Sequence, residues 1–378
     1  MEILGFTWNY VVVFLIVLTI LVFVHEYGHY WVAKRNGVRV QVFSVGFGPE
    51  IWGRNDISGT RWKVCAIPLG GYVKMFGEGG DDAKGEDKPE LTDEEKAVSF
   101  HYKSVGQRAA IVAAGPIVNF IFAIFAFAIL AGAIGTAVPL AAVGKVYKDS
   151  AADIAGFTSG DKFISINEEK ISLFSDLRRI VTANPEKTLS FKIERDGKQI
   201  NLSATPKLIV RKDEEGNEIK IGLLGVEWNS ESVMYERQNP AMALWVGTQQ
   251  TYMTTTKILS YIGDMISGSR GTDDLGGPLR IAQISGQMAE QGVGAVILLM
   301  AMLSVNLGLI NLFPIPMLDG GHLAFYSIEA LLGRPLNAKA QEYSFRFGLI
   351  LVLMLVVFVT WNDLVHLEVI EKIKGLIP

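Results

Sequence analysis

Four long apolar runs, separated by polar and charged segments, are the dominant pattern along the chain. Each run approaches or exceeds the roughly 20 residues that a helix needs to cross the hydrocarbon core of a bilayer. The pattern therefore predicts a polytopic α-helical membrane protein. Its four transmembrane helices are predicted at residues 1–34, 107–136, 291–325 and 343–366.

Lysine and arginine residues flank the predicted spans, and alternating topology places them all on one side of the membrane. Such residues are enriched in cytoplasmic loops, so we expect this side to be cytoplasmic. Both termini and the stretch from about 140 to 290 then lie outside, which for the inner (plasma) membrane of a bacterium is the periplasm. The flanking residues are Lys34, Arg35, Arg39, Lys103, Arg108, Arg334, Lys339 and Arg346.

The segments between the apolar runs show strand, turn and loop patterns. Residues 38–76 contain two strand-like runs with apolar side chains on both faces, which predicts a membrane-associated, re-entrant β-hairpin. Residues 77–106 begin with an acidic stretch and are predicted to be a solvated cytoplasmic loop followed by an interfacial segment. Short strands around one helix predict a small α+β domain at 140–228, and residues 229–290 favour helices near the membrane surface.

Composition narrows the possible function classes. The 378 residues are 49% hydrophobic and 20% charged, which excludes a purely cytosolic enzyme and extensive disorder. The net charge of −4 argues against a nucleic-acid partner, because nucleic-acid binding usually needs a basic surface. Cys65 is the one cysteine, so an internal disulfide and a thiolate zinc cage are excluded, and a metal would need His and carboxylate ligands.

An H-E-x-x-H motif, His25-Glu26-Tyr27-Gly28-His29, lies at the end of the first apolar run. Histidines at i and i+4 project from the same helix face, so both can bind one metal ion. Glu26 lies beside them and can accept a proton from water. A pair of interfacial histidines is the simpler alternative, but ionisable residues within a span are costly and usually functional. The motif therefore predicts a metal site with a catalytic glutamate.

A catalytic zinc site needs a third protein ligand besides water. Asp319 follows the third apolar run, and the predicted topology brings it to the same membrane depth as His25. Two prolines interrupt the helix just before it, as expected for backbone that lines a wet cavity. His322, three residues further on, is a rival ligand, and Asp319 could instead be a simple carboxylate at a helix end.

Six short segments carry distinctive motifs, and they occur in order along nearly the whole chain. They are His25–His29, Gly46–Gly48, Leu69–Met75, Gly115–Phe120, Ala155–Asp161 and Asn311–Gly321. Together they resemble the site-2 protease family of intramembrane zinc metalloproteases, most closely the bacterial regulator-of-sigma-E protease branch. The resemblance implies that His25, His29 and Asp319 bind one Zn²⁺ ion and that Glu26 is the catalytic base.

The resemblance also implies substrates and the residues that bind them. The partners are the lipid bilayer and transmembrane proteins such as an anti-sigma factor or remnant signal peptides, cleaved within or near their membrane segments. We further expect the edge of the hairpin to bind locally unwound substrate by strand addition. The residues that would contact substrate are Asn311, Pro314, Gly46, Gly48 and Asn119.

The run at 155–161 is similar to the signature of bacterial PDZ domains, which predicts an extramembrane PDZ domain at 140–228. This domain could capture a newly exposed C-terminal carboxylate or act as a steric gate, and the resemblance favours the gate. Two other classes compete with the protease. A zinc transporter or other metal-binding membrane protein would give Glu26 no role, and a PDZ scaffold without hydrolysis would leave residues 311–321 unexplained.

Overall fold

The computed structural model describes residues 2–78, 91–212, 218–229, 232–269, 271 and 276–366. The chain forms two compact units. The larger one consists of Met1–Leu130 with Pro240–Pro378, and the smaller one of Ala131–Asn239. Most of the acidic stretch that was predicted to be a solvated loop lies at 79–90, outside the described residues.

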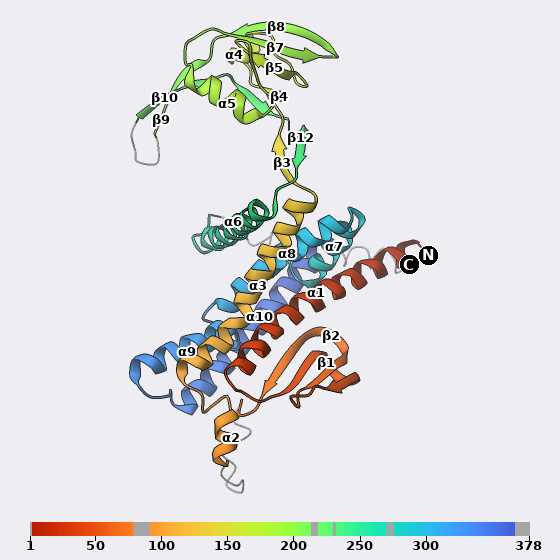
Figure 1. Ribbon diagram of the computed structural model, residues 1–378, viewed down its shortest axis with the longest axis vertical. Helices are drawn as coiled ribbons and strands as arrows, with labels where there is room; N and C mark the ends of the chain where they lie inside the picture. Colours follow the sequence, from red (N-terminus) through yellow and green to blue (C-terminus); the bar gives the residue numbers. More distant parts are fainter. Residues whose placement is uncertain are drawn as a thin grey trace. The chain divides into compact units, whose positions relative to one another are not determined.

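Among the described residues, four helices of the chain are long and apolar enough to cross a membrane. They are α1 (Glu2–Arg35), α3 (Val105–Ala133), α8 (Val293–Leu312) and α10 (Ala338–His366), shown in Figure 1. The third predicted helix, 291–325, extended too far, because α8 ends at Leu312 and Asp319 begins a separate helix, α9 (Asp319–Leu332). Pro314 and Pro316 explain the break, since proline lacks an N–H and disfavours helical backbone in the preceding residue.

Helix α3 contacts three other helices through glycines. A Cβ on Gly28 of α1 would lie 2.6 Å from the carbonyl oxygen of Ala114, and one on Gly308 of α8 would lie 3.0 Å from that of Pro116. Gly247 makes a similarly close approach from α6 (Pro240–Ile266). Small residues allow helix backbones to come this close, so α3 packs tightly against its neighbours.

The hairpin packs on α1 through aromatic rings. It consists of β1 (Val40–Asn55) and β2 (Arg61–Met75), which pair antiparallel. Phe43 stacks on Trp62 with ring centroids 4.3 Å apart, and Tyr30 of α1 meets these two rings edge-on at 5.7 and 5.1 Å. Asp56, in the turn, accepts hydrogen bonds from the Tyr30 hydroxyl and the Trp62 indole N–H. These contacts hold the hairpin against α1.

The smaller unit has one core between a sheet and a helix. Its four-stranded antiparallel sheet has the order β6-β5-β7-β8. Phe163 and Phe191 of this sheet share a buried cluster with Leu177 and Val181 of α5. The elements are β3 (Thr136–Pro139), β4 (Val143–Val146), α4 (Ala151–Ile154), β5 (Lys162–Ile166), β6 (Glu169–Lys170), α5 (Phe174–Ala183), β7 (Leu189–Arg195), β8 (Lys198–Ala204), β9 (Lys207–Lys212), β10 (Glu218–Leu223), β11 (Val226–Trp228) and β12 (Val233–Glu236).

This unit extends beyond the predicted limits of 140–228. Strand β3 pairs antiparallel with β12, with Val138 opposite Met234. Strand β12 lies in the stretch 229–290, which was predicted to be helical. The two strands are short and far apart in sequence, so their hydrophobic pattern is weak and only their pairing defines them.

An ion pair between Arg195 and a buried carboxylate fixes the glycine-containing run at 155–161 of the smaller unit. Arg195 donates to both carboxylate oxygens of Asp161, at 2.6 and 2.7 Å, and also to the carbonyl of Gly156 at 2.8 Å. The Thr158 N–H donates to the same carboxylate. Burial raises the pKa of Asp161, but the Arg195 guanidinium and the Thr158 N–H outweigh it and hold the pKa below its usual range.

Helix α10 is joined to α7 (Pro278–Glu290) by a buried carboxylate. Asp363 of α10 is 2% exposed and accepts the backbone N–H groups of Gly277, Leu279 and Arg280. The first N–H groups of a helix have no partner within it, so Asp363 caps α7 from a distant part of the chain. The larger unit also contains α2 (Asp93–Val98).

Candidate active site

Helix α1 by itself brings two possible metal ligands together. The Nε2 atoms of His25 and His29 are 3.2 Å apart, and their rings meet edge-on with centroids separated by 4.8 Å. Both side chains are nearly buried, at 8% exposure. The i, i+4 spacing of the motif therefore produces the predicted arrangement.

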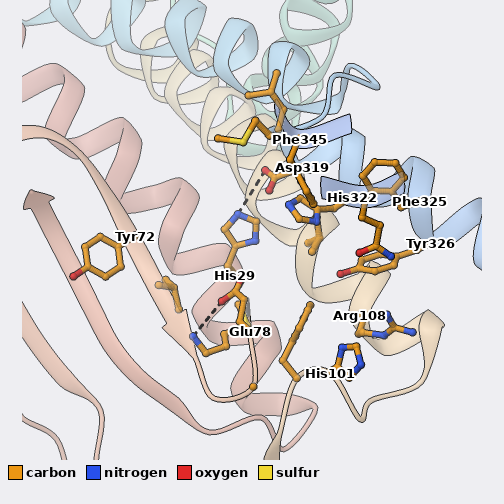
Figure 2. A pocket seen from close by; sticks show the side chains of 18 of the residues that line it. His29, Tyr72, Glu78, His101, Arg108, Asp319, His322, Phe325, Tyr326 and Phe345 are labelled. Atoms are coloured by element: carbon orange, nitrogen blue, oxygen red, sulfur yellow. Dashed lines mark hydrogen bonds and ion pairs between the residues drawn. The ribbon is translucent and has the colours of Figure 1, made fainter. Parts of the chain in front are cut away.

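Asp319, from the start of α9, completes the cluster (Figure 2). Its Oδ2 lies 3.1 Å from Nε2 of His25 and 3.6 Å from Nε2 of His29. In a tetrahedral zinc site with metal–ligand distances near 2.0–2.1 Å, neighbouring ligand atoms are about 3.3 Å apart. The three observed separations agree with that spacing, and the two imidazoles and one carboxylate are a ligand set that zinc uses. The residues present therefore fit a zinc ion.

The loop between α8 and α9 determines the position of Asp319. Met317 has φ of 90°, a conformation that residues other than glycine rarely adopt. A Cβ on Gly320 would lie 2.2 Å from the carbonyl oxygen of Phe313, and one on Gly321 would lie 2.4 Å from that of Ile315. The two glycines after Asp319 are therefore required because the loop folds back onto the first turn of α9.

The environment of Asp319 favours its ionised form. Burial raises the pKa of Asp319, but the adjacent imidazoles of His25 and His29 outweigh burial and hold the pKa well below its usual range. Its position in the first turn of α9 also places the negative charge at the positive end of the helix dipole. An aspartate binds a metal ion as the ionised carboxylate, so this environment supports metal binding.

The cluster opens into a cavity of about 1020 Å³ within the larger unit. Its size is at the upper end of the range for small-ligand pockets. Glu26 lines the cavity together with the stretch Gly70–Val73 of β2. A Cβ on Gly71 would lie 3.5 Å from Cγ of Glu26, so this strand passes directly beside the predicted catalytic glutamate.

The residues predicted to contact substrate occupy different places. Asn311 lines the cavity, whereas Pro314 of the α8–α9 loop and Gly46 and Gly48 of β1 are not among its described lining residues. The two glycines have φ of 88° and 86° and lie where the β1–β2 register is irregular, so they shape the hairpin. Asn119 is 0% exposed, and its side-chain amide lies against His25.

Sequence reasoning missed a polar group on the cavity wall. Nη2 of Arg108 lies 2.7 Å from Oε1 of Glu329, and its guanidinium carbon lies 4.9 Å from the centre of the Tyr326 ring. Figure 2 shows Arg108 and Tyr326 at the cavity. Burial raises the pKa of Tyr326 to about 12. The only signal in the sequence was the charge of Arg108 beside an apolar run, which had been used to orient the spans.

Known proteins are similar to this one in sequence over almost the whole chain. The family model of peptidase family M50 matches residues 13–355. The chain belongs to peptidase family M50. It is 46% identical to a protein of Agrobacterium fabrum named as a zinc metalloprotease. The alignment spans 365 residues and covers 95% of this chain and 97% of that protein. It is also 36% identical to the metalloprotease MmpA of Caulobacter vibrioides. That alignment spans 386 residues and covers 96% of this chain and 97% of MmpA.

Among solved structures, the PDZ domain of an SdrC-like protein from Listeria monocytogenes matches 25% of this chain and 93% of its own. The identity is 15% and the TM-score is 0.19. A match at this distance supports no conclusion about the smaller unit.

Membership of family M50, the site-2 protease family, confirms the predicted activity. This M50 peptidase is an intramembrane zinc metalloprotease, and its substrates are membrane proteins. The closer resemblance to the regulator-of-sigma-E branch is compatible with the family and stays a prediction.

Proposed function

We propose that His25, His29 and Asp319 are the zinc ligands of this M50 peptidase and that Glu26 transfers the proton during peptide hydrolysis. One observation carries this assignment. Within the described part of the chain, one nitrogen from each histidine and one oxygen from Asp319 lie within 4.8 Å of one another. Two helices far apart in the sequence thus supply one ligand set.

Bound zinc supplies a Lewis acid that activates water and polarises the peptide carbonyl. Glu26 lies in the same cavity but outside the ligand set. Its carboxylate can therefore take a proton from the attacking water and deliver it to the leaving amine as the amide C–N bond breaks. The two imidazoles and Asp319 remain in place throughout, because they hold the metal and exchange no proton with the substrate.

Replacing Asp319 tests the ligand set. In D319A only two ligands remain, and we expect zinc affinity to fall at least about 100-fold, since even partners that only orient a ligand are worth 10–100-fold. H322A is the matched control, because His322 lines the same cavity but lies outside the cluster. The zinc dissociation constant of H322A, measured by chelator competition, should equal that of the parent. Loss of zinc in H322A with normal zinc in D319A would identify His322 as the third ligand and reject our assignment.

We also propose that β2 holds the substrate as an added strand. Gly70, Tyr72 and Val73 line the cavity, and the described part of the hairpin pairs β2 with β1 on one side. A transmembrane helix hides its carbonyl groups in i→i−4 hydrogen bonds, so it must unwind before attack. A strand edge beside Glu26 would replace those bonds as the peptide becomes extended.

Proline substitutions at Tyr72 and Val73 test this role of β2. Successive N–H groups of a strand point to opposite edges, so one of the two variants removes a donor from the free edge. We expect that variant to keep its zinc and to cleave a single-span substrate roughly 3–10-fold more slowly, as for the loss of one hydrogen bond. The other variant should weaken the β1–β2 pairing and lower the thermal stability. Parental cleavage rates in both variants would exclude strand addition on β2.

We also propose a membrane orientation and a class of substrates. Lys34 and Arg35 follow the histidines on α1, and Arg108 lies near the start of α3. The positive-inside tendency then places the cluster near the cytoplasmic side of a bacterial inner membrane.

The smaller unit would be a periplasmic PDZ domain that gates the access of substrates to the cavity. Protease digestion of sealed vesicles of known sidedness measures on which side of the membrane this unit lies. Anti-sigma factors and remnant signal peptides are the proposed substrates.

A further inference from the structure

Both histidines of the cluster contact α3 through the ring nitrogen that faces away from Asp319. Nδ1 of His29 lies 2.9 Å from the carbonyl oxygen of Ile111. Nδ1 of His25 lies 3.0 Å from Nδ2 of Asn119, and the buried Oδ1 of Asn119 has no hydrogen-bond partner among the described residues. An imidazole binds a metal through an unprotonated nitrogen, so the other ring nitrogen carries the proton and needs an acceptor.

The partner of His29 meets this requirement directly. A backbone carbonyl can only accept, so the contact with Ile111 places the proton on Nδ1 and leaves the Nε2 lone pair facing the cluster. The partner of His25 is different, because an amide side chain has a donor end and an acceptor end of nearly the same shape. If Nδ2 of Asn119 donated to Nδ1, the proton of His25 would sit on Nε2 and block metal binding.

The surroundings of Asn119 limit the groups that its side chain can contact. Its side chain is 0% exposed, so it is not accessible to substrate in the cavity. Its backbone carbonyl accepts the hydroxyl of Ser304 of α8 at 2.8 Å, and a Cβ on Gly308 of the same helix would lie 3.3 Å from the Cβ of Asn119. Tight packing between α3 and α8 therefore holds the amide next to His25.

Resting on the ligand set proposed above, we propose that Asn119 is a positioning residue for the metal site. A half-turn of the amide exchanges Nδ2 and Oδ1 without changing the space that the side chain fills, and it gives the buried Oδ1 a partner. In that orientation Oδ1 accepts the Nδ1–H of His25 and leaves the Nε2 lone pair free to bind zinc. Helix α3 then determines the tautomer of both imidazoles, one through a backbone carbonyl and the other through a side chain. This role replaces the substrate contact expected from the sequence.

Two substitutions at Asn119, both similar in size to asparagine, distinguish three roles of its side chain: accepting a hydrogen bond from His25, donating one to it, or only filling space. N119D keeps an acceptor but has no donor, and N119L has neither. We expect zinc affinity to stay within about threefold of the parent in N119D, because carboxylate–histidine–zinc arrangements are common. In N119L it should fall 10–100-fold. T251A is the control, since it removes a buried hydrogen bond to the carbonyl of Gly247 in α6 without touching Asn119 or His25, and its zinc affinity should be unchanged.

The readouts are the zinc dissociation constant by chelator competition and the ¹H–¹⁵N spectrum of labelled histidines in the zinc-loaded protein. The parent and N119D should both show a hydrogen-bonded Nδ1–H of His25 with a downfield proton shift, and N119L should lose that shift. A merely structural role would not move this signal. If N119L fails to fold, the dissociation constant and spectrum of N119D still decide between acceptor and donor.

Two results would overturn the proposal. Zinc loss in N119D would mean that the amide donates or that its packing alone matters. Normal zinc in N119L with a raised KM would return Asn119 to substrate binding. The variant H25A tests the ligand set independently of Asn119. Normal zinc affinity in H25A would refute the ligand set itself, whatever the Asn119 substitutions show.

Discussion

Replacing Glu26 with glutamine is expected to remove peptide cleavage and leave zinc in place. Glutamine has nearly the same shape as glutamate but cannot accept a proton at neutral pH. Positioned proton transfer contributes typically 10²–10⁴-fold to a rate, so we expect a loss of that size in E26Q. Zinc should remain at parental stoichiometry because Glu26 lies outside the cluster of His25, His29 and Asp319.

The measurement compares purified parent and E26Q for zinc content and for cleavage of a single-span reporter substrate. E342Q is the control, because Glu342 lines the same cavity from α10 and pairs with Arg346. It should cleave at close to the parental rate. Equal activity in E26Q and the parent would show that Glu26 is not the base. Loss of zinc together with activity would show that Glu26 acts on the metal site instead.

Adding one methyl group at Gly115 is expected to prevent zinc binding. A Cβ at this position of α3 would lie 2.3 Å from Nε2 of His29 and 2.8 Å from Cε1 of His25. Both rings would have to leave the cluster, although Ile111 holds His29 from the other side. We therefore expect G115A to lose at least about 100-fold in zinc affinity, more than a partner that only orients a ligand would cost, and to lose cleavage with it.

The control for this prediction is G106A in the first turn of the same helix, where a Cβ would meet nothing within 4 Å. Zinc binding and cleavage should be unchanged there, and the helix should gain up to about 1 kcal/mol from the better helix propensity of alanine. Thermal unfolding of the zinc-free proteins separates loss of metal from loss of fold. A G115A protein that binds zinc like the parent would mean that the α1–α3 contact in this structure is wrong at the site.

The parts of the site that the sequence predicted are local or follow from topology. His25 and His29 share a face because an α-helix repeats every 3.6 residues. Asp319 was expected at the same depth because alternating spans bring their ends to one level, and the structure places it 3.1 Å from His25. The break at Pro314 also follows from backbone chemistry. The strand pair β3–β12 was missed, because its hydrophobic pattern is too short to be read.

The role of α3 could not be derived in the same way. Gly115 and Asn119 were recognised only as parts of a motif, and Ile111 carried no signal at all. Their positions relative to the imidazoles depend on how closely α3 approaches α1, and that distance is set by Gly28 against Ala114.

The amino-acid sequence alone determined the apolar spans, the hairpin and the choice of candidate metal ligands, because periodicity and residue chemistry act over a few neighbouring positions. Tertiary structure alone decided which helix surrounds those side chains, which groups face the Nδ1 atom of each imidazole, and why a glycine stands beside them. Such properties arise from contacts between segments distant in the chain, and close packing leaves only one arrangement of them.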